Sequence, residues 1–180
     1  MVSLLIFNKK ILELGTRKKI YNLIKKYEGC HFRDLERKSK FPASTLKYHL
    51  DYLSKNELIL EEKDRNNIRY FSKEFNTDDK ELLMLLRQNS IRNILIFLLT
   101  NNNCNHEDIV KFLKLSPSTV SWHLKKLKIK NVVSSIKEGK NTKYKLVINK
   151  QQIINLLIVY QESFLDSLVN KVIESWEVNP

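Results

Sequence analysis

Ser116-Pro117-Ser118-Thr119-Val120-Ser121-Trp122-His123-Leu124-Lys125-Lys126-Leu127 is the stretch from which the fold can be inferred. Ser116 is a suitable N-cap, and Pro117 then takes the first helical position, where its missing N–H costs nothing. Apolar residues recur at spacings of four and three and form one stripe, made of Val120, Leu124 and Leu127. The pattern predicts an amphipathic helix with one apolar face and one polar face.

The polar face of this helix suits the major groove of DNA. Small side chains near a helix N-terminus let the backbone approach base edges, and lysines further along meet phosphates. The alternative is an ordinary capped amphipathic helix, with Trp122 packed against a neighbouring part of the protein. The residues expected to contact DNA here are Pro117, Ser118, Ser121, Trp122, Lys125 and Lys126, joined by Lys140 and Lys143 from the segment that follows.

An internal repeat strengthens this interpretation. When the sequence is shifted by 74 residues, a second copy aligns without a gap from Thr16/Ser90 to Phe71/Lys145. A duplicated unit of this length predicts two domains rather than a short-period solenoid. The matching pairs include Ile20/Ile94, Cys30/Cys104, Asp34/Asp108, Ser44/Ser118, His49/His123, Leu53/Leu127, Asn67/Asn141 and Tyr70/Tyr144.

Each copy contains signals for three helices and two short strands. In the first copy we expect helices at 16–27, capped by Thr16, at about 31–39 and at about 42–55. Two β-prone runs, Leu58–Leu60 and Ile68–Phe71, flank a polar turn segment and predict a hairpin. This order is typical of a winged helix-turn-helix, in which the third helix enters the major groove and the hairpin is the wing.

The expected fold is therefore mostly α with small β wings: two tandem winged helix-turn-helix domains plus a long C-terminal helix. That helix should run from about Lys150 to Glu177, and its long apolar stripe should pack on another segment or on its copy in a homodimer. The expected division is 1–15 as an N-terminal packing segment, 16–76 as the first winged helix, 77–89 as a connecting helix, 90–148 as the second winged helix and 149–180 as the C-terminal helix.

Composition points to a polyanionic partner. The chain of 180 residues has a net charge of +12, and residues 111–150 hold eleven lysines against the single acid Glu138. Its three glycines build no phosphate-cradling loop, and no apolar run reaches membrane-spanning length. Two cysteines give no disulfide framework, which fits a reducing cytoplasm. The expected location is therefore the cytoplasm, with nucleoid association as a consequence of the expected DNA binding.

The motifs also resemble a known family. Ser118 to Leu127 resembles the recognition helix of ArsR/MarR-type winged-helix regulators, and Cys30 to Leu35 with Thr45 to Leu50 resembles the first domain of archaeal tandem winged-helix regulators. The resemblance covers about residues 10–148. It implies binding to double-stranded promoter DNA and, in some archaeal relatives, activation by recruiting the basal transcription factor B.

The first copy departs from the second in its third helix. Phe41-Pro42-Ala43 replaces Leu115-Ser116-Pro117, so the serine cap is missing, and Asp51 replaces Lys125 on the expected phosphate side. The first domain is thus expected to read an adjacent DNA site or to hold a protein partner. Its DNA-contacting residues would be Ser44, Lys47, Tyr48, Arg65 and Arg69.

Other functions have weaker support in the sequence. Cys30, Cys104, His31 and His106 lack the close spacing of a zinc site, so no metal and no cofactor are expected. His49 and His123 sit beside core leucines and are expected to be structural. No catalytic constellation is present in the sequence, so we do not expect an enzyme. The alternatives to a DNA-binding regulator are an adaptor that recruits basal transcription factors and an RNA-binding module.

Overall fold

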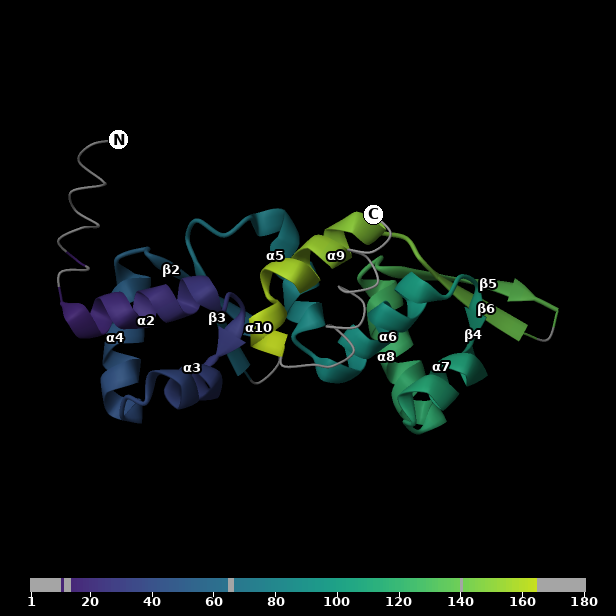
Figure 1. Ribbon diagram of the computed structural model, residues 1–180, viewed down its shortest axis with the longest axis horizontal. Helices are drawn as coiled ribbons and strands as arrows, with labels where there is room; N and C mark the ends of the chain where they lie inside the picture. The colour runs from purple at the N-terminus through teal and green to yellow at the C-terminus, as the bar shows by residue number, and fades with distance from the viewer. Residues whose placement is uncertain (1–10, 12–13, 65–66, 140, 165–180) are drawn as a thin grey trace. The chain divides into compact units, whose positions relative to one another are not determined.

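The computed structural model describes residues 11, 14–64, 67–139 and 141–164. The chain divides into two compact units, Met1–Met84 and Leu85–Pro180. Within the described residues, each unit contains helices followed by a β-hairpin in the same order (Figure 1). The predicted fold class of two tandem winged helices with small β wings is confirmed.

The first unit is built on three helices and a three-stranded antiparallel sheet. The sheet order is β1-β3-β2, and the long hairpin pairs Ile59 with Ser72 at one end and Asp64 with Asn67 at the other. The elements are α2 (Gly15–Lys26), β1 (Cys30–His31), α3 (Phe32–Ser39), α4 (Ala43–Lys55), β2 (Ile59–Asp64) and β3 (Asn67–Ser72), followed by α5 (Thr77–Leu86).

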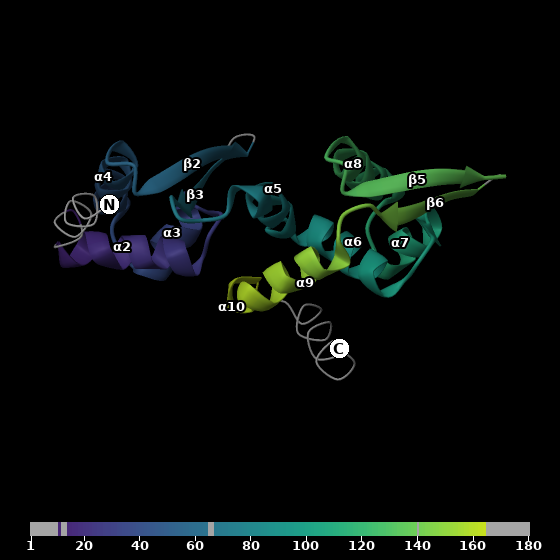
Figure 2. The ribbon, with the colours of Figure 1, turned by 90° about the horizontal axis from the view of Figure 1, so that it is seen from above.

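The second unit repeats this plan with the same strand register. The sheet order is β4-β6-β5, and each paired position lies 74 residues after its counterpart, as Val133 with Leu146 repeats Ile59 with Ser72. The long hairpin of strands β5 and β6 extends away from the helices of the unit (Figure 2). The elements are α6 (Asn89–Thr100), β4 (Cys104–Asn105), α7 (His106–Leu113), α8 (Pro117–Ile129), β5 (Val133–Glu138) and β6 (Asn141–Leu146), followed by α9 (Lys150–Val159) and α10 (Gln161–Phe164).

Matching positions of the two copies form the two hydrophobic cores. Helices α2, α3 and α4 bury apolar side chains to 0–1% exposure, and the equivalent side chains of α6, α7 and α8 are 0–2% exposed. Their burial fixes which face of α4 and of α8 remains at the surface. The pairs are Ile20/Ile94, Ile24/Leu98, Leu35/Ile109, Leu46/Val120, Leu50/Leu124 and Leu53/Leu127.

Left-handed backbone positions also recur at the same spacing. Lys40 and Lys114 have φ of 56° and 52° at the ends of α3 and α7, where the turn into the next helix begins. Glu57 and Asn131 follow α4 and α8 with φ of 55° and 54°. Because non-glycine residues rarely adopt positive φ, this agreement shows that the two copies share their turns as well as their helices.

Three details differ from the expectations. Helix α2 begins at Gly15 and has Leu14 at its N-cap position. Because leucine has no polar side-chain atom, the helix has no side-chain cap, and Thr16 lies inside the helix rather than at its cap. Each sheet has a third strand of two residues, too short to leave a periodic pattern. The predicted long C-terminal helix is wrong in its described part, since α9 ends at Val159 and α10 begins at Gln161.

Packing explains the interruption of the C-terminal helix. After the break, the Phe164 ring is buried and lies 4.9 Å from the Arg92 guanidinium carbon and 5.3 Å from that of Arg87. These cation–π contacts with residues at the start of the second unit stabilise the turned chain. The rest of the predicted helix, residues 165–180, lies outside the described residues, as does the predicted N-terminal packing segment apart from buried Ile11 and from Leu14 and Gly15.

Among the described residues, no single helix has the length and apolar character needed to cross a membrane. Helices α5 and α6 meet that criterion only when they are counted together as one interrupted segment.

Candidate nucleic-acid interface

Helix α8 starts and packs as its sequence predicts. The Ser116 hydroxyl accepts a hydrogen bond from Thr119 N at 3.2 Å, and Pro117 opens the helix. A side-chain cap of this kind satisfies one of the free N–H groups at a helix start. The predicted stripe is buried to 1% exposure or less at Val120, Leu124 and Leu127.

The opposite face of α8 is open to solvent. Pro117, Ser118, Ser121 and Lys125 are all exposed. Trp122 is 44% exposed, and its ring packs edge-on against His123 at 4.8 Å between centroids. An apolar ring exposed at the surface in this way can contact thymine methyl groups.

A hydrogen bond that the sequence did not reveal links α7 to this face. His106 Nε2 lies 2.9 Å from the Ser121 hydroxyl. His106 is the first residue of α7, which is capped by Asn105 through a reciprocal bond with Asp108. The contact fixes the Ser121 side chain and places an imidazole beside it. Only the packing of α7 on α8 brings the two residues together, so spacing along the chain could not have indicated the pair.

The lysines near α8 differ in their surroundings. Lys125 is exposed and makes no side-chain hydrogen bond or ion pair with another described residue. Lys126 donates to Gln88 Oε1 at 3.0 Å and is held within its own unit. Lys143 pairs with Glu138 at 2.6 Å on the wing, and Lys128 donates to the Ser135 hydroxyl at 2.7 Å. Surface pairs of this kind contribute little stability, so Lys143 can exchange its partner for a phosphate.

Two of the expected DNA contacts cannot be placed. Lys140 of the second wing and Arg65 of the first lie outside the described residues. Gly139, beside Lys140, has φ of 60°, a left-handed conformation that glycine adopts readily at the turn between β5 and β6.

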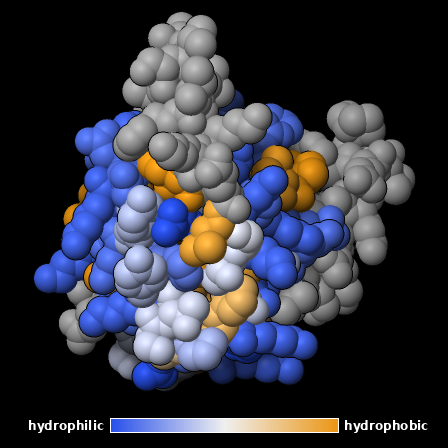
Figure 3. Space-filling model, turned by 90° about the vertical axis from the view of Figure 1, so that its left-hand side faces the viewer, coloured by the Kyte–Doolittle hydropathy of each residue, from blue (hydrophilic) through white to orange (hydrophobic). Residues whose placement is uncertain are grey.

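The equivalent face in the first unit is also exposed but carries mixed charge. Ser44 and Lys47 are exposed, Tyr48 is 61% exposed, and Asp51 lies on the same side of α4. Helix α4 has no side-chain cap, because Pro42 stands at its N-cap position. The side of the molecule on which α2 and α4 lie is largely hydrophilic, with separate hydrophobic patches (Figure 3).

Arg69 must be removed from the set of expected DNA contacts. Its side chain is 6% exposed, and Nη1 donates to the carbonyl oxygen of Gly29 at 2.8 Å. This bond is buried and joins residues 40 positions apart. Arg69 therefore stabilises the junction of β1 and β3 rather than facing a phosphate.

The cysteines and histidines do not gather into a metal site in the described part of the chain, where no group of three or more His, Cys, Asp or Glu residues is arranged to hold an ion. Cys30 and Cys104 are buried in their separate sheets. Burial raises the pKa of the Cys104 thiol above its ordinary value, and nearby Asp108 adds to the effect. A protonated, buried thiol is a poor metal ligand.

Two protein-family models match the chain. Residues 14–83 match a family described as an N-terminal HTH domain, and residues 89–135 match the bacterial regulatory protein, arsR family. The two matches fall on the two copies of the internal repeat.

Individual proteins also resemble the chain. An uncharacterized HTH-type transcriptional regulator of Methanocaldococcus jannaschii is 34% identical over 140 residues, which are 78% of this chain. This chain spans only 35% of the length of that relative. The solved structure of HlyU from Vibrio cholerae is 26% identical with a TM-score of 0.42, covering 48% of this chain and 98% of HlyU. A Corynebacterium diphtheriae protein is 12% identical with a TM-score of 0.30, covering 73% of this chain and 26% of that protein.

The fold and the sequence matches agree on the domains. Each unit has the helices, the hairpin and the exposed third helix of a winged helix-turn-helix, and each matches its own helix-turn-helix family model. The predicted resemblance is thus confirmed: the chain consists of two helix-turn-helix domains in tandem and is similar to archaeal tandem winged-helix regulators.

Proposed function

We propose that the chain is a sequence-specific, double-stranded DNA-binding transcription regulator in which the second winged helix makes the main contact with DNA. The observation that carries the proposal is the exposed face of α8. It combines the small side chains of Ser118 and Ser121, the surface ring of Trp122 and the exposed Lys125 within the most basic part of the chain. Small side chains and a ring suit base edges, and an exposed lysine suits a phosphate.

The first winged helix is proposed to have a lesser part in DNA binding. Its α4 carries Asp51 at the position of Lys125, and Glu61 of β2 also faces the space beside α4. Carboxylates on this surface repel phosphates. Ser44, Lys47 and Tyr48 can still make weaker contacts with an adjacent stretch of DNA.

Charge reversal at equivalent positions tests this assignment. Lys125→Glu should weaken binding to duplex DNA by about tenfold or more near 0.1 M salt, because one lost phosphate contact lowers the salt slope by about 0.9. Asp51→Lys should not weaken binding. Fluorescence anisotropy with a labelled promoter duplex across a salt series measures both the affinity and the slope.

A control with the same change in charge separates a local contact from the effect of net charge. Lys19→Glu replaces an exposed lysine of α2, which is not a recognition helix, and should reduce the affinity much less than Lys125→Glu. Equal losses of affinity for the two lysine variants would show that DNA binding depends only on the net charge of the protein. The proposed α8 interface would then be incorrect.

An adaptor is the second candidate function. The carboxylates of Asp51 and Glu61 on the first unit favour this function, because an acidic surface that repels DNA can bind a basic protein. The relevant partner would be the basal transcription factor B, as the family resemblance implies. Binding of the purified factor to the full chain, with no binding of duplex DNA, would favour the adaptor over the regulator.

The chain is also proposed to act in the cytoplasm, associated with the nucleoid, and to form a homodimer through its C-terminal region. In the described part of that region, α9 presents exposed apolar side chains, with Ile158 41% and Val159 69% exposed. Light scattering that shows a monomer at micromolar concentration would exclude the dimer.

A further inference from the structure

The contact between His106 and Ser121 joins two helices at the surface of the second unit. His106 Nε2 and the Ser121 hydroxyl oxygen lie 2.9 Å apart, and Ser121 is exposed on the face of α8 that is proposed to contact DNA. Either atom can be the donor or the acceptor, depending on which imidazole nitrogens carry a hydrogen. The role that Ser121 takes toward His106 therefore decides which role its hydroxyl has left for DNA.

The fold anchors both partners of this contact. Asn105, the residue before His106, pairs with Lys143 in the sheet and caps α7. Its side-chain oxygen accepts from Asp108 N at 2.9 Å, and Asp108 Oδ2 accepts from Asn105 N at 3.0 Å. Ser121 lies one turn into α8, whose buried apolar stripe fixes the orientation of the helix. The imidazole and the hydroxyl are therefore held in place from two different elements.

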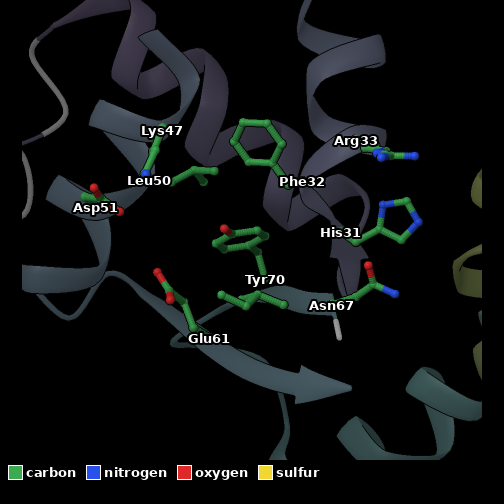
Figure 4. A pocket seen from close by; sticks show the side chains of 10 residues that line it. His31, Phe32, Arg33, Lys47, Leu50, Asp51, Glu61, Asn67 and Tyr70 are labelled. Carbon is green, nitrogen blue, oxygen red and sulfur yellow. The ribbon is translucent and has the colours of Figure 1, made fainter. Parts of the chain in front are cut away.

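The first unit cannot form an equivalent contact. The corresponding residues are Phe32 and Lys47, which line an open pocket around Tyr70 (Figure 4). A phenyl ring has no atom that accepts or donates a conventional hydrogen bond. The contact thus occurs in the copy whose recognition helix carries the exposed Lys125 and is proposed to make the main contact with DNA.

Protonation of the imidazole reverses the direction of this hydrogen bond. Neutral imidazole has one free nitrogen, which accepts readily from a serine hydroxyl, as it does in pairs of serine with a histidine base. Ser121 then donates its hydrogen to His106 and offers only lone pairs to DNA. When both nitrogens carry hydrogen, Nε2 must donate to Ser121, and the serine hydrogen points outward. The outward role of the hydroxyl changes from acceptor to donor.

The outward role of Ser121 matters because bases differ in what they present in the major groove. An acceptor suits the amino groups of cytosine and adenine, and a donor suits O6 and N7 of guanine and O4 of thymine. Histidine is the side chain that ordinarily changes its charge between about pH 5 and 8. We propose that His106 is a positioning residue that sets the hydrogen-bonding role of Ser121, so that the base preference of α8 changes with pH. This inference rests on the proposed binding of duplex DNA by the second unit.

Ionisable groups on the neighbouring elements have to be separated from this effect. His123 on α8 is a second histidine, and its ring packs on Trp122. Helix α6 carries only Arg92, which donates to the carbonyl oxygen of Leu86. The other ionisable groups at the start of α7, next to Ser121 on the exposed face of α8 and on the paired strands β4 and β6 are Glu107, Asp108, Lys125, Cys104, Lys143 and Tyr144. A variant of His106 leaves all of these groups in place and therefore isolates its contribution.

Base-pair substitutions in a promoter duplex test the proposal with the full chain. Each base pair of a duplex from upstream of its own gene is replaced in turn, and Kd is measured by fluorescence anisotropy at about pH 5 and about pH 8. At one position or more, the ratio of Kd values between duplexes should change by about two- to tenfold, the worth of one hydrogen bond. The change should favour guanine or thymine at the lower pH. His106→Gln and Ser121→Ala should each make this ratio independent of pH, while circular dichroism checks that both variants remain folded.

A histidine of the first unit provides a matched control. His31→Asn removes a histidine and introduces the residue that the second unit has at the same position, Asn105, so the pH dependence should equal that of the parent protein. A different result for His106 would overturn the positioning role. If low pH raised the affinity equally for all duplexes and steepened the salt slope by about 0.9, His106 would be a direct phosphate contact instead.

Nitrogen-15 magnetic resonance of the imidazole rings tests the hydrogen bond without DNA. In the free parent chain above about pH 8, Nε2 of His106 should be the nitrogen without hydrogen, and Ser121→Ala should shift its resonance. A neutral ring with its hydrogen on Nε2 would overturn the inference, because Ser121 would then already donate outward. If the parent chain binds no duplex at all, the proposed function fails and this inference fails with it. Duplex binding whose base preference does not depend on His106 overturns this inference alone.

Discussion

Gly29 offers a quantitative test of the first unit. Its φ of 74° lies in the left-handed region, and a Cβ at this position would lie 3.1 Å from Phe71 Cζ and 3.2 Å from Phe71 Cε1. The Phe71 ring is fully buried and packs against Phe75 at 5.2 Å between centroids, so it has little freedom to move. Gly29→Ala should therefore strain both the backbone and the core.

The size of the effect follows from these two contributions. The left-handed conformation costs an L-residue about 1–2 kcal/mol, and overpacking a filled core costs about 1–3 kcal/mol. Gly29→Ala should lower the free energy of unfolding by about 2–5 kcal/mol. Urea unfolding of the full chain, followed by circular dichroism, should show an earlier midpoint for the first unit.

The second copy provides a matched control. Asn103 is the counterpart of Gly29 and has φ of 56°, while the counterpart of Phe71 is the exposed Lys145. Asparagine tolerates this conformation, and no buried ring opposes it, so Asn103→Gly should change the free energy of unfolding by less than about 1 kcal/mol. If Gly29→Ala is as stable as the parent protein, the backbone conformation or the ring contact described here is incorrect.

Two further predictions concern the helix cap and the pocket. Ser116→Ala removes the cap of α8 and should cost about 1 kcal/mol, measurable by thermal unfolding, whereas Ser118→Ala at the neighbouring exposed position should have a smaller effect; equal effects would mean that the cap does not matter. Burial, and then the charges of Glu61 and Asp51, raise the pKa of Tyr70 to about 12 from its ordinary value of 10.0. Since the folded protein holds the phenol neutral, its contribution to stability is present below pH 10 and is lost as pH rises toward 12. The difference between the tyrosinate absorbance titrations of the parent protein and of Tyr70→Phe should correspond to one group that ionises near pH 12. Ionisation of Tyr70 near pH 10 would contradict its buried position.

The repeat made much of the fold predictable from sequence. A fixed shift of 74 residues aligned the core positions of α4 with those of α8. The helices and the hairpin predicted for one copy could therefore be transferred directly to the other copy. Ser116 and Pro117 determined the start of α8 because capping depends on only a few adjacent residues. The short strands β1 and β4 were missed, since two residues carry no periodicity.

Features that depend on contacts between distant residues were not predictable. Arg69 has the charge of a DNA contact, yet its guanidinium reaches the carbonyl of Gly29 across the sheet. Lys126 follows Lys125 directly in the sequence, yet its side chain donates to Gln88 instead of lying free at the surface. The C-terminal helix is interrupted at Tyr160, where no proline or glycine in the sequence predicts a break. The pocket around Tyr70 likewise arises only when α3, α4 and the wing come together.

The most direct test of the central claim is the binding of the full chain to duplex DNA taken from upstream of its own gene, measured by fluorescence anisotropy across a salt series beside a scrambled duplex and a single strand. We predict tighter binding to the native duplex than to either competitor, with a logarithmic salt slope of about −0.9 for each phosphate contacted. Equal, weak binding to all three nucleic acids, or a preference for the single strand, would contradict the assignment of this chain as a sequence-specific DNA-binding regulator.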